Sequence, residues 1–131
     1  MPEPATPATD ASRLGAAFAR ALAAKDFARA AALLHPDVDF GALTPRRAWE
    51  AHTPEQVAAE VLSVWFDDDC ELDELVRVER ETFRDRERVA YQLRGRGPDG
   101  PFLMEQQAYL TARDGRIGWM RVLCSGKRPL G

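Results

Sequence analysis

The chain has 131 residues, enough for one domain whose folding can remove about two-thirds of the unfolded surface from water. Hydrophobic residues make up 45% and charged residues 30%, and the net charge of −3 gives no basic surface of the kind that binds nucleic acid. The two cysteines, Cys70 and Cys124, are far apart and form no CxxC motif, so they indicate neither a zinc ribbon nor a disulfide framework.

The first nine residues predict a disordered tail, because three prolines stand there among small residues that offer nothing to bury. Residues 10–131 are expected to form a single domain. No segment has the apolar length of a signal peptide or of a membrane span, so we expect no membrane partner and a cytoplasmic location.

Two helices are predicted to form a hairpin near the start of the domain. Asp10 or Ser12 can cap the first, whose apolar residues recur every three or four positions until about Ala24. Asp26 caps a shorter second helix, and Pro36 ends it because the residue before a proline is disfavoured in helical geometry.

A third helix is predicted to begin at the sequence Thr53-Pro54-Glu55-Gln56. Thr53 is the cap, Pro54 takes the first helical position, and Gln56 reaches back as in a capping box. The acidic run of residues 67–69 opposes the helix dipole at a C-terminal end, so it is expected beyond the helix. The buried side of the helix is predicted from its apolar spacing to carry Val57, Val61, Val64 and Trp65.

Six strands are predicted, two short ones before the third helix and four long ones after it. The Gly97-Pro98-Asp99-Gly100 and Asp114-Gly115 sequences are tight-turn signals that join the long strands into hairpins. Strands of this length would reach roughly 30–40 Å, too long to stay flat beside three short helices, so the sheet must bend. The predicted strands are residues 38–43, 46–52, 72–83, 88–96, 102–112 and 117–124.

This order of elements resembles the nuclear transport factor 2-like superfamily, which includes ketosteroid isomerases and SnoaL-like cyclases. The run from Phe18 to Phe27, the passage Ala32-Leu-Leu-His-Pro-Asp-Val38 and the last hairpin, residues 114–123, carry the resemblance. It implies an α+β fold in which three N-terminal helices pack on a strongly curved antiparallel sheet, shaped as a cone. It implies a fold rather than an activity, because many unrelated functions share this fold.

Steroid-isomerase chemistry is not expected of this chain. That chemistry needs a carboxylate base together with a phenol and a protonated carboxylic acid that stabilise an oxyanion. Aligning the family's landmarks places Phe18 at the phenol, Ala42 or Leu43 at the base and Gln107 near the acid. All three positions therefore lack the required proton chemistry.

The third long strand allows two interpretations of which side chains face inward. Period-two alternation alone sends its more apolar set, which includes Phe102, Met104 and Leu110, to the core. The resemblance implies instead that the concave face receives the other set, since the convex face often packs on a second subunit. We adopt the second interpretation, which makes the apolar set a homodimer surface and directs Glu105, Gln107 and Tyr109 into the cone.

Glu105 is the candidate catalytic residue, because a carboxylate inside a dry cone has a raised pKa and can act as general acid or base. The alternative is a structural glutamate paired with Arg94 or Arg121. No metal site or cofactor is expected, since the two histidines lack a ligand frame. The remaining candidate pocket residues are Phe18, Trp49, His52, Trp65, Tyr91, Gln107, Tyr109 and Met120.

Two classes of function remain open. The first is a SnoaL-like pocket protein that binds a small hydrophobic metabolite and uses Glu105 for isomerase, cyclase or hydrolase chemistry. The second is a noncatalytic dimerising or ligand-binding module whose pocket is filled by its own side chains. An open cavity with Glu105, Gln107 and Tyr109 converging would favour the first class, and a packed cone would favour the second.

Overall fold

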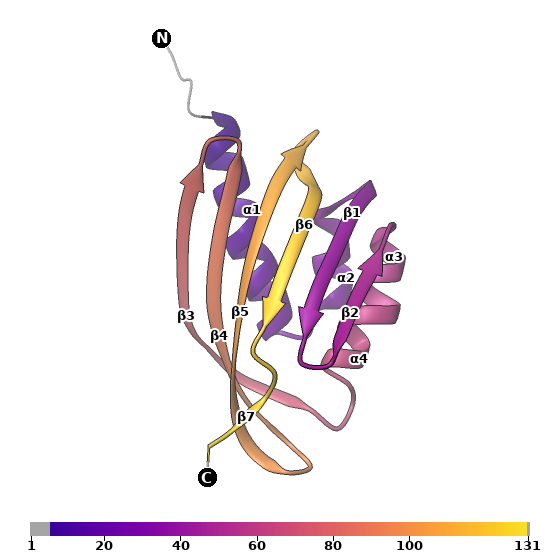
Figure 1. Ribbon diagram of the computed structural model, residues 1–131, viewed down its shortest axis with the longest axis vertical. Helices are drawn as coiled ribbons and strands as arrows, with labels where there is room; N and C mark the ends of the chain where they lie inside the picture. The colour runs from indigo at the N-terminus through magenta and orange to yellow at the C-terminus, as the bar shows by residue number, and fades with distance from the viewer. Residues whose placement is uncertain (1–5, 131) are drawn as a thin grey trace.

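The computed structural model describes the backbone of residues 6–130 and the side chains of residues 13–130 (Figure 1). A large sheet forms one layer and the helices lie together on one of its faces. Among the described residues, no helix is long and apolar enough to cross a membrane. The helical segments are α1 (Thr6–Ala23), α2 (Phe27–Ala32), α3 (Pro54–Gln56), the π-helical η1 (Val57–Leu62) and α4 (Ser63–Trp65).

The sheet has seven strands, and six of them follow the order β2-β1-β6-β5-β4-β3 while β7 pairs with β5. All the strand pairs are antiparallel except one, because β1 runs parallel to β6. The sheet is therefore mixed, which corrects the expectation of an antiparallel sheet. The strands are β1 (Leu34–Thr44), β2 (Arg47–Ala51), β3 (Glu71–Phe83), β4 (Arg86–Gly97), β5 (Gly100–Arg113), β6 (Arg116–Cys124) and β7 (Arg128–Pro129).

The first helix begins earlier than predicted. It starts at Thr6, so residues 6–9 are helical rather than part of a disordered tail, and residues 1–5 lie outside the described residues. Asp10 and Ser12 consequently lie within the helix and are not its caps. Pro7 is tolerated because the first turn of a helix has backbone N–H groups without partners inside the helix.

The caps predicted for the other two helices are confirmed. The side chain of Asp26 accepts a hydrogen bond from Arg29 N at 3.0 Å, and Thr53 Oγ1 accepts one from Gln56 N at 3.1 Å. Gln56 Oε1 in turn accepts from His52 N at 2.8 Å, one residue before the cap. The third helix therefore starts where its sequence predicts.

The third helix widens into a π-helix over residues 57–62, which changes the side that it buries. A π-helical turn inserts an extra residue and rotates the positions that follow. Leu62 is thereby fully buried, whereas Val64, predicted to be buried, is 52% exposed. The acidic run of residues 67–69 lies beyond Trp65, the last residue of α4, as predicted.

The core lies between the helices and the inner face of the sheet, which is the face that the helices cover. Helix α1 packs across β3, β4 and β5. Phe102, Met104 and Leu110 of β5 are 4%, 3% and 0% exposed, so they belong to this core. They cannot form the expected dimer surface, and the inward direction expected for Glu105, Gln107 and Tyr109 is wrong as well. Period-two alternation alone predicts the observed faces, because the apolar set goes to the helix side.

Candidate functional site

The predicted site residues lie in three separate places. Five of them are buried in the inner layer, Glu105, Gln107 and Tyr109 are on the outer face of the sheet, and His52 is on the loop before α3. The buried five are Phe18, Trp49, Trp65, Tyr91 and Met120, and none is more than 9% exposed. Each set has to be considered as a site of its own.

Tyr91 forms a buried polar pair with Gln106, a residue that the sequence did not single out. The phenol of Tyr91 donates to Gln106 Oε1 at 2.6 Å, and the two residues are directly opposite across β4 and β5. Both side chains are 1% exposed, and burial raises the pKa of the Tyr91 phenol. Gln106 Nε2 is also buried and has no hydrogen-bond partner among the described residues. The signal available in the sequence was one amide within an otherwise apolar set on β5.

An aromatic cluster lies beside the third helix. The rings of Trp49 and Trp65 meet edge to face with centroids 5.9 Å apart, and Phe40 lies 6.5 Å from Trp65. Trp49 donates its indole N–H to Thr44 Oγ1 at 2.9 Å. The indole Nε1 of Trp65, by contrast, is buried and has no hydrogen-bond partner in the described part of the chain. Among the described residues, the inner layer therefore holds two N–H donors, on Gln106 and Trp65, that lack acceptors.

Acidic groups are scarce in this layer. Among residues 13–130, Glu87 is the only buried carboxylate, and it accepts a hydrogen bond from the backbone N–H of Gly15 in α1 at 3.2 Å. This hydrogen bond joins α1 to β4, so the Glu87 carboxylate helps to hold the helix against the sheet. The inner face thus offers hydrogen-bond donors more readily than acids or bases.

Glu105, the predicted catalytic residue, is exposed on the outer face. Its carboxylate accepts from Gln92 Nε2 at 3.0 Å, on the neighbouring strand. The two arginines considered as its partners, Arg94 and Arg121, form their ion pairs with other carboxylates. The argument for acid or base catalysis depended on burial in the cone, and that burial is absent.

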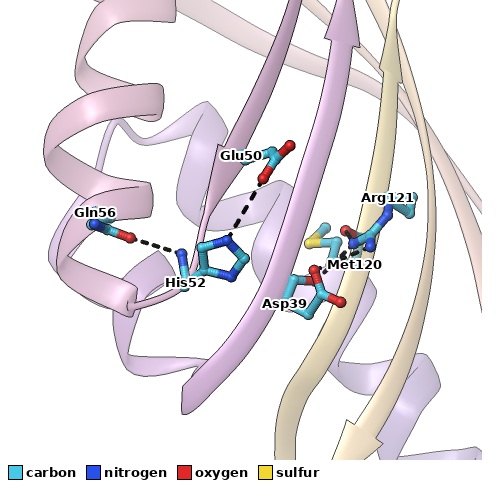
Figure 2. A network of polar contacts seen from close by, with 6 residues as sticks. All are labelled: Asp39, Glu50, His52, Gln56, Met120 and Arg121. Carbon is cyan, nitrogen blue, oxygen red and sulfur yellow. Dashed lines mark hydrogen bonds and ion pairs between the residues drawn. The ribbon is translucent and has the colours of Figure 1, made fainter.

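His52 and Arg121 belong to two neighbouring polar contacts, the first at the β2 edge of the sheet and the second between β1 and β6, which Figure 2 shows from close by. His52 Nε2 lies 3.7 Å from Glu50 Oε1, and both side chains are largely exposed. Arg121 forms an ion pair with Asp39 across the parallel strands at 3.1 Å. The Arg121–Asp39 pair connects β6 with β1, whereas the His52–Glu50 contact lies within β2 and the loop that follows it. Among the described residues, no three His, Cys, Asp or Glu side chains are grouped as a metal site.

Three hollows are found on the outer face of the sheet. A hollow of about 280 Å³ lies between Glu105, Gln107 and Arg77, and one of about 400 Å³ lies between Leu43, Leu123 and Gln107. The third, of about 550 Å³, lies at the end of the β3–β4 hairpin beside Trp119. Glu105, Gln107 and Tyr109 therefore do line hollows, but these open to solvent on the side away from the helices.

Comparisons with known proteins identify the fold. No protein-family model and no curated protein match the sequence. Among solved structures, an LEH-like epoxide hydrolase from M. tuberculosis is similar with a TM-score of 0.65 and 17% identity over 89% of this chain and 84% of its own. A nuclear transport factor 2-like protein from Burkholderia xenovorans LB400 has a TM-score of 0.67 and 15% identity, with 89% and 90% of the chains covered.

A third similar structure is a protein of ketosteroid isomerase-like fold from Catenulispora acidiphila DSM 44928 in complex with trimethylamine. It has a TM-score of 0.65 and 14% identity, and the match covers 86% of this chain and 85% of the other. The chain thus has the nuclear transport factor 2-like α+β fold that its sequence resembles. Identities this low establish the fold and leave the activity open.

Proposed function

We propose that the chain binds a small, largely apolar molecule that carries an oxygen acceptor, on the inner face of the sheet beside Gln106. The observation that carries this proposal is the buried Gln106 Nε2, which has no partner among the described residues. A buried donor left without an acceptor costs about 1–3 kcal/mol. A ketone, ester or epoxide oxygen placed against this amide would remove that cost.

The hollows described above lie on the outer face, so inner-face side chains must move to admit such a ligand beside Gln106. Met104 and Ala108 flank Gln106 on the same face of β5, and a methionine can change rotamer to make room for a ligand. Trp65 Nε1 supplies a second buried donor in the same layer. Proteins of this fold include an epoxide hydrolase, whose name implies a small epoxide ligand. At this inner-face site we propose binding without acid or base catalysis, because Glu105 is exposed on the other face and Glu87 binds the α1 backbone.

The test compares two neighbouring glutamines that face opposite sides of one strand. A panel of neutral ketones, esters and epoxides is titrated into wild type, Gln106→Leu and Gln107→Leu, and the melting temperature is measured. A ligand that binds only the folded state raises this temperature as its concentration rises. We expect at least one compound to stabilise wild type and Gln107→Leu but not Gln106→Leu. The proposal fails if no compound stabilises wild type, or if Gln106→Leu responds equally.

A second candidate function is homodimerisation through the outer face. Leu43 and Leu123 are 56% and 58% exposed and lie opposite each other across β1 and β6. Charged side chains of both signs surround them on this face, including Glu50 and Arg121, so a second copy related by a two-fold axis can place opposite charges together. Exposed apolar residues in adjacent positions are typical of an interaction surface.

Sedimentation velocity tests this dimer. Wild type is expected to sediment as a dimer, and Leu123→Asp as a monomer, because the substitution places a charge in the apolar centre of the interface. Val64→Asp is the matched control, since Val64 is similarly exposed, at 52%, but lies on the helix side. A monomeric wild type, or a dimer that survives Leu123→Asp, would exclude this interface.

The cytoplasmic location and the assignment of residues 10–131 to one domain stay predictions. The location is supported by Cys70 and Cys124, which are both buried and form no disulfide. Acid or base catalysis by Glu105 also stays a prediction. The support for this prediction is that Glu105 lines a hollow on the outer face.

A further inference from the structure

The hollow at the end of the β3–β4 hairpin combines exposed aromatic rings with arginines. Its volume is about 550 Å³, within the range of pockets that hold small ligands. Phe83 is 63% exposed and Tyr109 is 38% exposed, although most large apolar side chains of this chain are buried. The hollow is lined by Glu81, Thr82, Phe83, Arg86, Arg88, Tyr109 and Trp119.

The two arginines of the hollow differ in what they already bind. Arg88 forms an ion pair with Glu81 at 2.7 Å and donates to Gln107 Oε1 at 3.2 Å. Arg86 has no carboxylate within ion-pair distance among the described residues, and its guanidinium lies over the Trp119 ring, 4.4 Å from the centroid. The hollow therefore holds one guanidinium that is positioned by an aromatic ring but not neutralised.

The local charge is opposite in sign to that of the whole chain. Arg86 and Arg88 against Glu81 leave the lining with one positive charge, whereas the chain has a net charge of −3. An anion is thus attracted to this hollow by its local charge. A guanidinium presents a planar pair of donors that matches a carboxylate.

We propose that this hollow is a binding site for an aromatic carboxylate. The ring of the ligand packs against the exposed side chains of Phe83 and Tyr109, and its carboxylate binds the guanidinium of Arg86, which lies over the Trp119 ring. This site lies on the outer face of the sheet, away from Gln106, and it does not depend on the ligand proposed for the inner face. The size of the hollow accommodates a ligand of two fused rings.

The probe for this site is 2-naphthoate, and the neutral 2-naphthamide is its control. Binding is followed by the indole N–H resonances of the three tryptophans in a two-dimensional NMR spectrum. We expect 2-naphthoate to shift the Trp119 resonance, and Arg86→Gln to weaken its affinity about tenfold through loss of a charge-assisted contact. Arg20→Gln, an equal loss of charge on the exposed side of α1, should leave the affinity unchanged.

Phe83→Ala provides a second variant, and it leaves the core intact because Phe83 is exposed. This substitution should weaken the affinity for both 2-naphthoate and 2-naphthamide, because it removes a ring contact that does not depend on charge. The proposal is overturned if 2-naphthoate leaves Trp119 unshifted, if Arg86→Gln and Arg20→Gln bind it equally, or if the shifts fall on Trp49 and Trp65 instead. It is also overturned if Arg86→Gln alters self-association while leaving the affinity for 2-naphthoate unchanged.

Discussion

The Tyr91–Gln106 pair makes a specific prediction about how two substitutions combine. In wild type one buried donor, Gln106 Nε2, lacks a partner, while the phenol and Gln106 Oε1 satisfy each other. Tyr91→Phe would leave both polar ends of the amide without partners. Gln106→Leu would leave only the phenol without one, and the double variant would leave none of the three.

Each buried polar group without a partner costs about 1–3 kcal/mol, and replacing both partners by apolar groups of similar shape is nearly neutral. Tyr91→Phe alone should therefore destabilise the fold by about 1–3 kcal/mol. Adding Gln106→Leu to Tyr91→Phe should restore about 2 kcal/mol or more, although Gln106→Leu alone should change stability little. For a domain of this size 1 kcal/mol corresponds to roughly 3–6 °C in melting temperature.

Urea unfolding of the four proteins measures these free energies, and the near-ultraviolet circular dichroism confirms that each variant is folded. The decisive quantity is the coupling between the two substitutions, which a double-mutant cycle isolates. If the effects are additive, or if the double variant is less stable than Tyr91→Phe alone, the two side chains are not the isolated buried pair described here.

Three further substitutions or conditions have predictable effects. Gly15→Ala should destabilise the fold by about 1–3 kcal/mol in urea unfolding, because the added methyl carbon would overlap Glu87 Oε1 and lie 3.0 Å from Glu87 Cδ. A higher free energy of unfolding, as the better helix propensity of alanine alone would give, would contradict this. Arg96→Gln should raise the pKa of Asp73 in a carbon-detected NMR titration, because the guanidinium hydrogen bond lowers that pKa. The contribution of this contact to stability is present above the ordinary pKa of aspartate and is lost as the pH falls. An Asp73 pKa that is the same in Arg96→Gln and in wild type would exclude this contribution. Burial raises the pKa of the Cys70 thiol, so the folded chain favours the protonated thiol. The stability that the protonated thiol contributes to the fold is complete below the ordinary thiol pKa and is lost as the pH rises through the folded value. Iodoacetamide should accordingly label Cys70 more slowly in the folded than in the urea-unfolded chain, and equal rates would refute its burial.

The elements of the fold could be predicted from the sequence because local chemistry determines them. Thr53, Pro54 and Gln56 occupy helix-start positions that the backbone requires, and Asp114-Gly115 form a turn in which both residues adopt positive φ, 53° and 80°. Such signals depend on neighbouring residues alone. The parallel pairing of β1 with β6 has no local signal, because no pattern within either strand distinguishes it from antiparallel pairing.

The candidate site was harder to predict, because alternation separates two faces without telling which one the helices cover. The resemblance directed Glu105 inward, whereas the hydrophobicity of Phe102, Met104 and Leu110 correctly indicated the opposite. Gln106 was missed because it belongs to the apolar set, where a single amide looked like an exception. A single polar residue within an apolar face is therefore the signal that would have identified the buried Gln106.

The parallel contact between β1 and β6 also affects how the chain folds in time. Arg121 and Asp39, which join these strands, are 82 positions apart, and most of the domain lies between them. During synthesis the hairpin of β1 and β2 is made early but has no neighbour along its inner edge until β6 emerges. Contacts between distant segments slow folding because the chain must first close a long loop. Strand β6 thus covers the free edge of β1, and a chain truncated before residue 116 should expose that edge and aggregate.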